Sequence, residues 1–197
     1  MSRRERKKEE TRGNIIDTAV SLFEEKGFQE TSMEEIAEKS DVSKGTLYNY
    51  FQDKESILVG YFQTIIADYF DEIKESLMVN MNIETRLYTL LGLMSKIFKN
   101  HDELALIYFK HRMKSPIDVN LVDSSQRSGV EKWVLEIMEK AQENGQLRSD
   151  IPALVLTRNF QFLAMSFFVS SIYTKETLDI EYIKTQLIGL FLNGAKQ

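Results

Sequence analysis

Residues 32–58 constrain this chain more than any other segment, because they predict a short helix, a tight turn, a second short helix and the start of a third. Ser32 is followed three positions later by Glu35, the spacing of a capping box at a helix start. The next apolar residues share one face at helical spacing: Met33, Ile36 and Ala37. Small Ala37 allows a second helix to cross closely.

The turn and the second short helix follow directly. Asp41 occupies the position where a helix-turn-helix often places glycine in the left-handed region, which Asp tolerates better than most residues. Ser43 is placed to cap the next helix. Leu47 and Phe51, four residues apart, are predicted to face inward.

The opposite face of the second helix has an unusual composition. At about 100° of rotation per residue, Gly45 and Asn49 point away from Leu47, and Thr46 and Tyr48 flank them. A core does not require this mixture of small, polar and aromatic groups. It suits a helix that lies against a groove lined with phosphates.

Asp53 is placed to cap a third helix, with Lys54 in its first turn. A cation there opposes the helix dipole. We therefore expect Lys54 to hold a phosphate, and the alternative is an exposed, solvated lysine.

The segment IAEKSDVSKGTLYNYFQDKESIL resembles the DNA-binding signature of the TetR (tetracycline-repressor) family of bacterial regulators. The preceding IIDTAVSLFEEKGFQETSM resembles the family's first helix, so the resemblance covers roughly the first third of the chain. Departures from the family pattern are Asp41, Asn49 and Tyr50. Asn49 and Tyr50 bear on the DNA sequence that is recognised.

The resemblance implies a ligand-responsive transcriptional regulator, a repressor in our prediction, that binds a roughly palindromic operator on double-stranded DNA. The residues implied to approach base edges or the DNA backbone are Gly45, Thr46, Tyr48 and Asn49. Among them, an Asn side chain is suited to adenine and a Thr methyl group to the thymine methyl group. Its implied phosphate contacts, among which Lys44 is an alternative guanine ligand, are Thr31, Ser32, Lys44, Tyr48, Tyr50 and Lys54.

Charge is distributed unevenly along the chain, whose net charge is −5. Residues 1–12 hold six cations and three glutamates, whereas residues 1–60 hold ten cations and thirteen anions. DNA binding therefore requires the acidic side chains to lie away from the groove, and these include Glu24, Glu25, Glu34 and Glu38. The basic N-terminal arm either contacts DNA or is a disordered, solubilising tail.

The chain is predicted to be all-α, with about nine helices, because strand patterns are nearly absent and only two prolines occur. We expect a three-helix DNA-binding domain over residues 1–53 with the first helix beginning near Thr11. A larger helical domain for regulation and dimerisation follows over 54–197. The break at Ser115–Pro116 and a long helix from Val119 or Asp123 belong to this second domain.

Two apolar helices at the C-terminus predict a homodimer. TetR-like proteins pair through such helices as a four-helix bundle, and a two-fold dimer reads two half-sites. The residues predicted for this seam are Phe160, Leu163, Phe167, Ile183, Leu187, Leu190 and Phe191. The alternative is that these residues form the core of a monomer.

A small-molecule effector is the remaining partner that the resemblance implies. Aromatic and methionine side chains in the C-terminal region can line an adaptable apolar pocket, although they are more often core. The candidate pocket residues are Phe98, Tyr108, His111, Trp133 and Phe162.

Catalysis, metal binding and cofactors are not expected. The two histidines, His101 and His111, fall about 15 Å apart along a helix and cannot share a metal. Cysteine is absent, and the common catalytic and nucleotide-binding motifs are missing. The most apolar run, about 14 residues, is too short for a membrane span. We expect a cytoplasmic protein. The rival function is a helical ligand-binding or protein-interaction module without a DNA role.

Overall fold

The computed structural model describes residues 2–78, 82–114, 129–173 and 179–195. These residues form nine α-helices and no strand, so the all-α prediction is confirmed. The predicted break at Ser115–Pro116 and the predicted helix start at Val119 or Asp123 lie outside the described residues. Contacts divide the chain into an N-terminal unit, Met1–Thr64, and a C-terminal unit, Ile65–Gln197. The predicted domain boundary after Asp53 stays a prediction.

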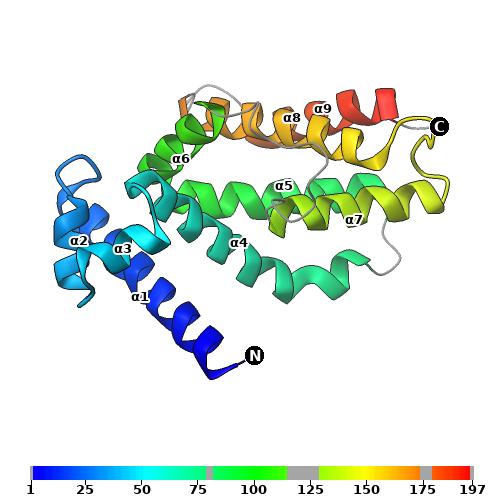
Figure 1. The fold of residues 1–197 in the computed structure, drawn as a ribbon. Helices are drawn as coiled ribbons and strands as arrows, with labels where there is room; N and C mark the ends of the chain where they lie inside the picture. The colour runs from blue at the N-terminus through cyan, green and yellow to red at the C-terminus, as the bar shows by residue number, and fades with distance from the viewer. Residues whose placement is uncertain (1, 79–81, 115–128, 174–178, 196–197) are drawn as a thin grey trace. The chain divides into compact units, whose positions relative to one another are not determined.

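The N-terminal unit contains α1 (Arg3–Lys26), α2 (Met33–Lys39), α3 (Lys44–Tyr50) and the first part of α4 (Lys54–Met78) (Figure 1). Its core comes from one apolar stripe on each helix. The fully or nearly fully buried members are Ile15, Ile16, Ala19, Phe23, Ile36, Ala37, Leu47, Phe51, Ile57, Leu58 and Phe62.

Helix α1 ends at a glycine with positive φ. Gly27 adopts φ +94°, and its N–H donates to the Phe23 carbonyl at 3.0 Å. Phe28 then packs back on Phe23, with ring centroids 4.8 Å apart. Glycine suits this C-terminal position because a side chain would be strained at positive φ.

The start of α1 differs from the prediction. The helix begins at Arg3 instead of near Thr11, and Ser2 caps it. Ser2 and Glu5 form a complete capping box, which satisfies two backbone donors at the helix start. The basic arm is therefore helical.

The C-terminal unit contains the rest of α4 and five further helices: α5 (Ile83–Asn100), α6 (Asp102–Lys114), α7 (Gly129–Glu143), α8 (Ala153–Tyr173) and α9 (Ile180–Ala195). Helix α8 packs against α5, α6, α7 and α9, and α5 also packs against α9 (Figure 1). Aromatic rings from α5, α6 and α8 meet in the interior of the C-terminal unit. The centroid of the Phe98 ring lies 4.6 Å from that of Phe109 and 5.0 Å from that of Phe168.

Helix α8 is also the one described helix that is long and apolar enough, over Ala153–Ser171, to cross a membrane by length and composition. A single such helix is weak evidence for a span, since the core helix of a soluble protein meets the same criterion. Here α8 packs against four other helices. The expectation that the chain has no membrane partner stays a prediction.

Candidate nucleic-acid interface

The turn between α2 and α3 is held by polar contacts to the backbone. Asp41 adopts φ +54°, the left-handed conformation that its position predicts. The Ser40 hydroxyl donates to the Ile36 carbonyl at 2.6 Å, and the Asn14 amide donates to the Ser40 carbonyl at 2.8 Å. The turn therefore joins α1 to α2 and sets the direction in which α3 leaves.

Helix α3 is anchored through one face. Leu47 is fully buried and Phe51 nearly so. Ser43 caps the helix, because its hydroxyl accepts from the Thr46 N–H at 3.1 Å. The Ser43 and Thr46 hydroxyls also share a hydrogen bond of 2.8 Å. The cap at Ser43 is confirmed as predicted.

The outward face of α3 carries the side chains that the sequence predicts for DNA. Tyr48 is 48% exposed, and Lys44, Gly45 and Asn49 are exposed as well. Thr46 is half-buried. A Cβ added at Gly45 would meet nothing closer than the Ser43 hydroxyl at 3.9 Å, so packing inside the protein does not require glycine there. A close approach of an external surface does explain it.

Lys44 lies beside a carboxylate, which the sequence analysis did not expect. Its ammonium group is 3.4 Å from the Glu34 carboxylate on α2, and both side chains are more than half exposed. A hydrogen bond from its own backbone N–H and the nearby Lys44 charge lower the pKa of Glu34. The Glu34 carboxylate therefore flanks the start of α3, close to the predicted DNA-binding residues.

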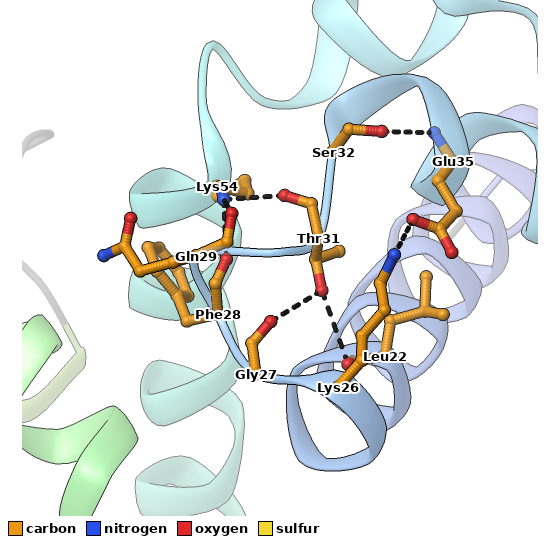
Figure 2. A network of polar contacts seen from close by, with 9 residues as sticks. All are labelled: Leu22, Lys26, Gly27, Phe28, Gln29, Thr31, Ser32, Glu35 and Lys54. Carbon is orange, nitrogen blue, oxygen red and sulfur yellow. Dashed lines mark hydrogen bonds and ion pairs between the residues drawn. The ribbon is translucent and has the colours of Figure 1, made fainter.

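Two predicted phosphate ligands are engaged inside the protein (Figure 2). The Thr31 side chain is buried, and its hydroxyl contacts the carbonyl oxygens of Gly27 at 2.9 Å and Leu22 at 3.4 Å. The Lys54 ammonium donates to the carbonyls of Phe28, at 2.6 Å, and Thr31, also at 2.6 Å.

Lys54 is in fact saturated. A third carbonyl, that of Gln29, accepts from the same ammonium at 3.2 Å, and the group lies 4.7 Å from the centroid of the Phe28 ring. An ammonium group has only three protons to donate. The structure therefore corrects both sequence-based interpretations of Lys54. It is neither a solvated lysine nor one with a free donor for phosphate.

Ser32 and Tyr50 lie at the margins of this interface. Ser32 is exposed and caps α2, accepting from the Glu35 N–H at 3.2 Å. The capping box is only half formed, because the Glu35 carboxylate bonds to Lys26 (Figure 2). That bond is the main reason that the pKa of Glu35 is lowered. Tyr50 is half-buried.

The predicted dimer residues fall on two different faces. Phe160, Phe167 and Phe191 are 1%, 2% and 7% exposed, so they belong to the core of their own chain. The half-buried members are Leu163, Ile183 and Leu187, whereas Leu190 is 69% exposed.

The predicted effector residues do not form one cluster. Phe98 and Tyr108 lie together, with ring centroids 5.9 Å apart. Trp133 instead stacks on Phe70 at 4.0 Å, and His111 is half-buried on α6. Phe162 is 54% exposed on the surface of α8, which removes it from any interior pocket.

Comparison with known proteins agrees with this geometry. Residues 15–60 match the family model described as bacterial regulatory proteins of the tetR family. This match contains α2, α3 and the turn between them. It therefore covers the part of the chain that carries the outward face of α3.

Full-length relatives extend the similarity to both units. The chain is 26% identical to Thermus thermophilus FadR, a TetR-family transcriptional repressor crystallised with lauroyl-CoA. The match covers 93% of this chain and 94% of that chain, with a TM-score of 0.74. It is 19% identical to the fatty acid metabolism regulator protein of Bacillus subtilis, over 91% of this chain and 93% of the relative. It is 22% identical to the transcriptional repressor KstR2 of Rhodococcus jostii, over 93% and 90%.

The helix-turn-helix geometry, the family match and these full-length relatives agree. Residues 15–60 therefore carry the DNA-binding domain of the TetR family, and the chain as a whole resembles a TetR-family transcriptional repressor in sequence and fold.

Proposed function

We propose that this protein is a repressor that binds a palindromic operator as a homodimer and is released by a fatty acyl-CoA. The observation that carries the proposal is the outward face of α3, where Tyr48 and Asn49 are exposed while Leu47 is buried. Exposed aromatic and amide groups on a short helix that is rigidly anchored suit base-edge readout in a major groove.

The DNA-binding part of the proposal is tested with the duplex that flanks the protein's own coding region. Fluorescence anisotropy titrations at several salt concentrations compare this duplex with one of shuffled sequence. A repressor of its own promoter binds the flanking duplex about 10³-fold tighter or more, which is the lower range for specific recognition. Equal affinity for the two duplexes would favour the rival function, a helical module without a specific DNA role.

The homodimer is supported by an apolar surface on α8 and α9. Four large apolar side chains on these helices are each 45–69% exposed: Val155, Phe162, Tyr182 and Leu190. Val155 and Phe162 are seven residues apart, so they lie on one face of α8. A second copy of the chain is the partner that we assign to this surface. One recognition helix reads too few bases for specific binding, and a two-fold dimer supplies a second recognition helix.

The effector class follows from a relative and from the interior of the C-terminal unit. The 26% identical Thermus thermophilus FadR was crystallised with lauroyl-CoA. A long acyl chain needs apolar surroundings. The rings of Phe98, Phe109 and Phe168, packed at centroid distances of 4.6–5.9 Å, provide such an interior between α5, α6 and α8.

A titration of the preformed DNA complex tests this effector. Lauroyl-CoA is expected to release the DNA, with a coupling free energy of about 1–3 kcal/mol. Coenzyme A and laurate, each added alone at the same concentration, control for the two halves of the molecule. If lauroyl-CoA leaves the complex intact, the effector proposal fails while the DNA-binding proposal stands.

The protein acts without catalysis in this proposal. The relatives named above are transcriptional regulators, and among the residues that the structure describes no group of His, Asp and Glu side chains could hold a metal ion. A regulator of this kind works where the chromosome is, and we place it in the cytoplasm.

A further inference from the structure

The first two turns of α1 form a helical extension outside the core. Every residue from Ser2 to Glu10 is exposed, and the first buried residue of the helix is Ile15. At 1.5 Å per residue, Arg3 lies about 18 Å beyond Ile15 along the helix axis. Within the N-terminal unit, Figure 1 shows these turns leading away from α2 and α3.

Four cations gather on one face of this extension, which we call the cationic face: Arg3, Arg4, Lys7 and Lys8. At about 100° per residue, these four side chains span an arc of roughly 140°. Glu5 and Glu9 project on the opposite side of the helix. The two other cations among residues 1–12 are paired, Arg6 with Glu10 at 3.5 Å and Arg12 with Glu9 at 3.7 Å.

The cationic face differs from the rest of the N-terminal unit in having no intramolecular partner. Among the described residues, none of its four side chains forms an ion pair or a hydrogen bond. The other cations are engaged: Lys26 with Glu35, Lys44 with Glu34, Lys54 with three carbonyls, and Lys39 close enough to Glu35 to lower its pKa. The charge that is available to an external anion is therefore concentrated in the extension.

This arrangement works against the stability of the helix. Cations in the first turn oppose the helix dipole. Like charges four residues apart also repel each other, and two turns without tertiary contacts are marginal in water. The capping box of Ser2 and Glu5 is one contact that holds the extension helical. A polyanion along the cationic face would remove the repulsion and stabilise the same turns.

We propose that the cationic face of α1 binds backbone phosphates of operator DNA outside the bases contacted by α3. The inference rests on the proposed DNA-binding function and adds a second contact region to it. A regularly spaced row of phosphates complements a row of cations on a helix. The acidic balance of residues 1–60 also requires such a region, because the helix-turn-helix itself has little free positive charge to offer.

The test compares two variants with the same change in charge. One removes the cationic face (R3Q/R4Q/K7Q/K8Q). The other removes four exposed lysines of the C-terminal unit (K96Q/K99Q/K110Q/K132Q). The equilibrium constant for operator binding is measured against salt concentration for both variants and the natural sequence. Circular dichroism and thermal melting establish that each variant is folded.

The expected result is a shallower salt dependence for the cationic-face variant only. Its slope of log K against log salt should fall by about 0.9 for each DNA phosphate that the variant no longer neutralises. Affinity should fall by the same factor on operator and shuffled DNA, because binding to phosphates carries no sequence information. An unchanged slope, or an equal fall of the slope in both variants, overturns the inference. In that case, the proposed function still stands if the natural protein binds its operator specifically. If the natural protein does not bind its operator, both fail.

Discussion

The ammonium group of Lys54, in the first turn of α4, lies 2.6 Å from the carbonyl oxygen of Thr31, the residue that precedes the α2 cap. This contact joins two segments that are 23 residues apart in the sequence. The Thr31 hydroxyl in turn bonds to the end of α1 at the Gly27 carbonyl. The two residues thus hold the starts of α2 and α4 against the end of α1, which positions the helix-turn-helix.

Replacing Lys54 by Met is expected to destabilise the N-terminal unit. Met keeps the length of the side chain but leaves three carbonyls without their donor, and hydrogen bonds to a charged group contribute about 1.5–3 kcal/mol. Urea unfolding followed by circular dichroism measures the decrease in stability. Lys39→Met is the control, because Lys39 is exposed. A fully stable Lys54→Met variant with a reduced salt slope would instead assign Lys54 to a phosphate.

Gly45→Ala should separate stability from DNA binding. The added methyl group meets only the Ser43 hydroxyl, at an ordinary contact distance of 3.9 Å, and Ala restricts the unfolded chain, so stability should rise by about 0.4–1 kcal/mol. DNA affinity should fall, because the methyl group lies on the surface that approaches the duplex. Thermal melting and an operator titration measure the two effects. A variant that gains stability and keeps full affinity would show that DNA does not approach Gly45.

Glu34→Gln should strengthen DNA binding. The Glu34 carboxylate pairs with Lys44 and would stand close to the phosphates that flank α3. The gain in affinity should be small, because both side chains of the pair are more than half exposed and solvent and salt screen their charges. Because the pKa of Glu34 is lowered, the carboxylate stays charged at neutral pH and only substitution removes the charge. Glu38→Gln, exposed on the same helix, serves as the control. An equal gain in both variants would indicate a general charge effect.

Phe162→Glu combined with Leu190→Glu should produce monomers. Both side chains are more than half exposed on the surface that we assign to the second copy, and buried glutamates without partners would oppose association. Sedimentation velocity measures the outcome, with Ser149→Glu as a control at an exposed site on the connection between α7 and α8. Dimers that persist in the double variant would move the interface to another surface.

A pH-dependent contact links α5 to α9. The buried Lys184 donates to Glu181 at 2.8 Å and lies 3.8 Å from the centroid of the Tyr88 ring, while the Tyr88 hydroxyl donates to the same carboxylate. The Lys184 donor, followed by Tyr88, lowers the pKa of Glu181. The resulting stability is present above the ordinary value near 4.5 and is lost as pH falls through the lowered pKa.

Glu181→Gln should therefore be less stable than the natural protein at pH 7, and the difference should shrink on acidification. Urea unfolding at a series of pH values measures it. Glu103→Gln, at an exposed site on α6, controls for the removal of a surface charge. A difference that is constant between pH 7 and pH 3 would show that the carboxylate charge contributes nothing.

Local capping chemistry explains which parts of the fold were predictable from the sequence. Ser43 and Asp41 were predicted with their conformations, because a helix cap and a left-handed turn residue each depend on positions only a few residues away. The early start of α1 was missed, although Ser2 and Glu5 show the same S-x-x-E spacing that identified the start of α2. The density of charge around that motif placed these residues in an arm before the first helix in our prediction, an arm that either contacts DNA or is a disordered tail.

Tertiary contacts explain what the sequence did not reveal. The role of Lys54 depends on carbonyls that the loop between α1 and α2 leaves without other donors, and no pattern in the sequence identifies them. Helix α8 is apolar on nearly all sides, so periodicity did not distinguish its buried Phe160 from its exposed Phe162. The two phenylalanines were consequently assigned to the wrong surfaces.

The central claim is that the outward face of α3 reads operator DNA. It is tested most directly by Tyr48→Ala, measured by anisotropy on operator and shuffled duplexes, with circular dichroism and sedimentation run in parallel. We predict unchanged helicity and assembly, and operator affinity weakened by about 1–3 kcal/mol. An intact variant that binds the operator as tightly as the natural protein would contradict the account.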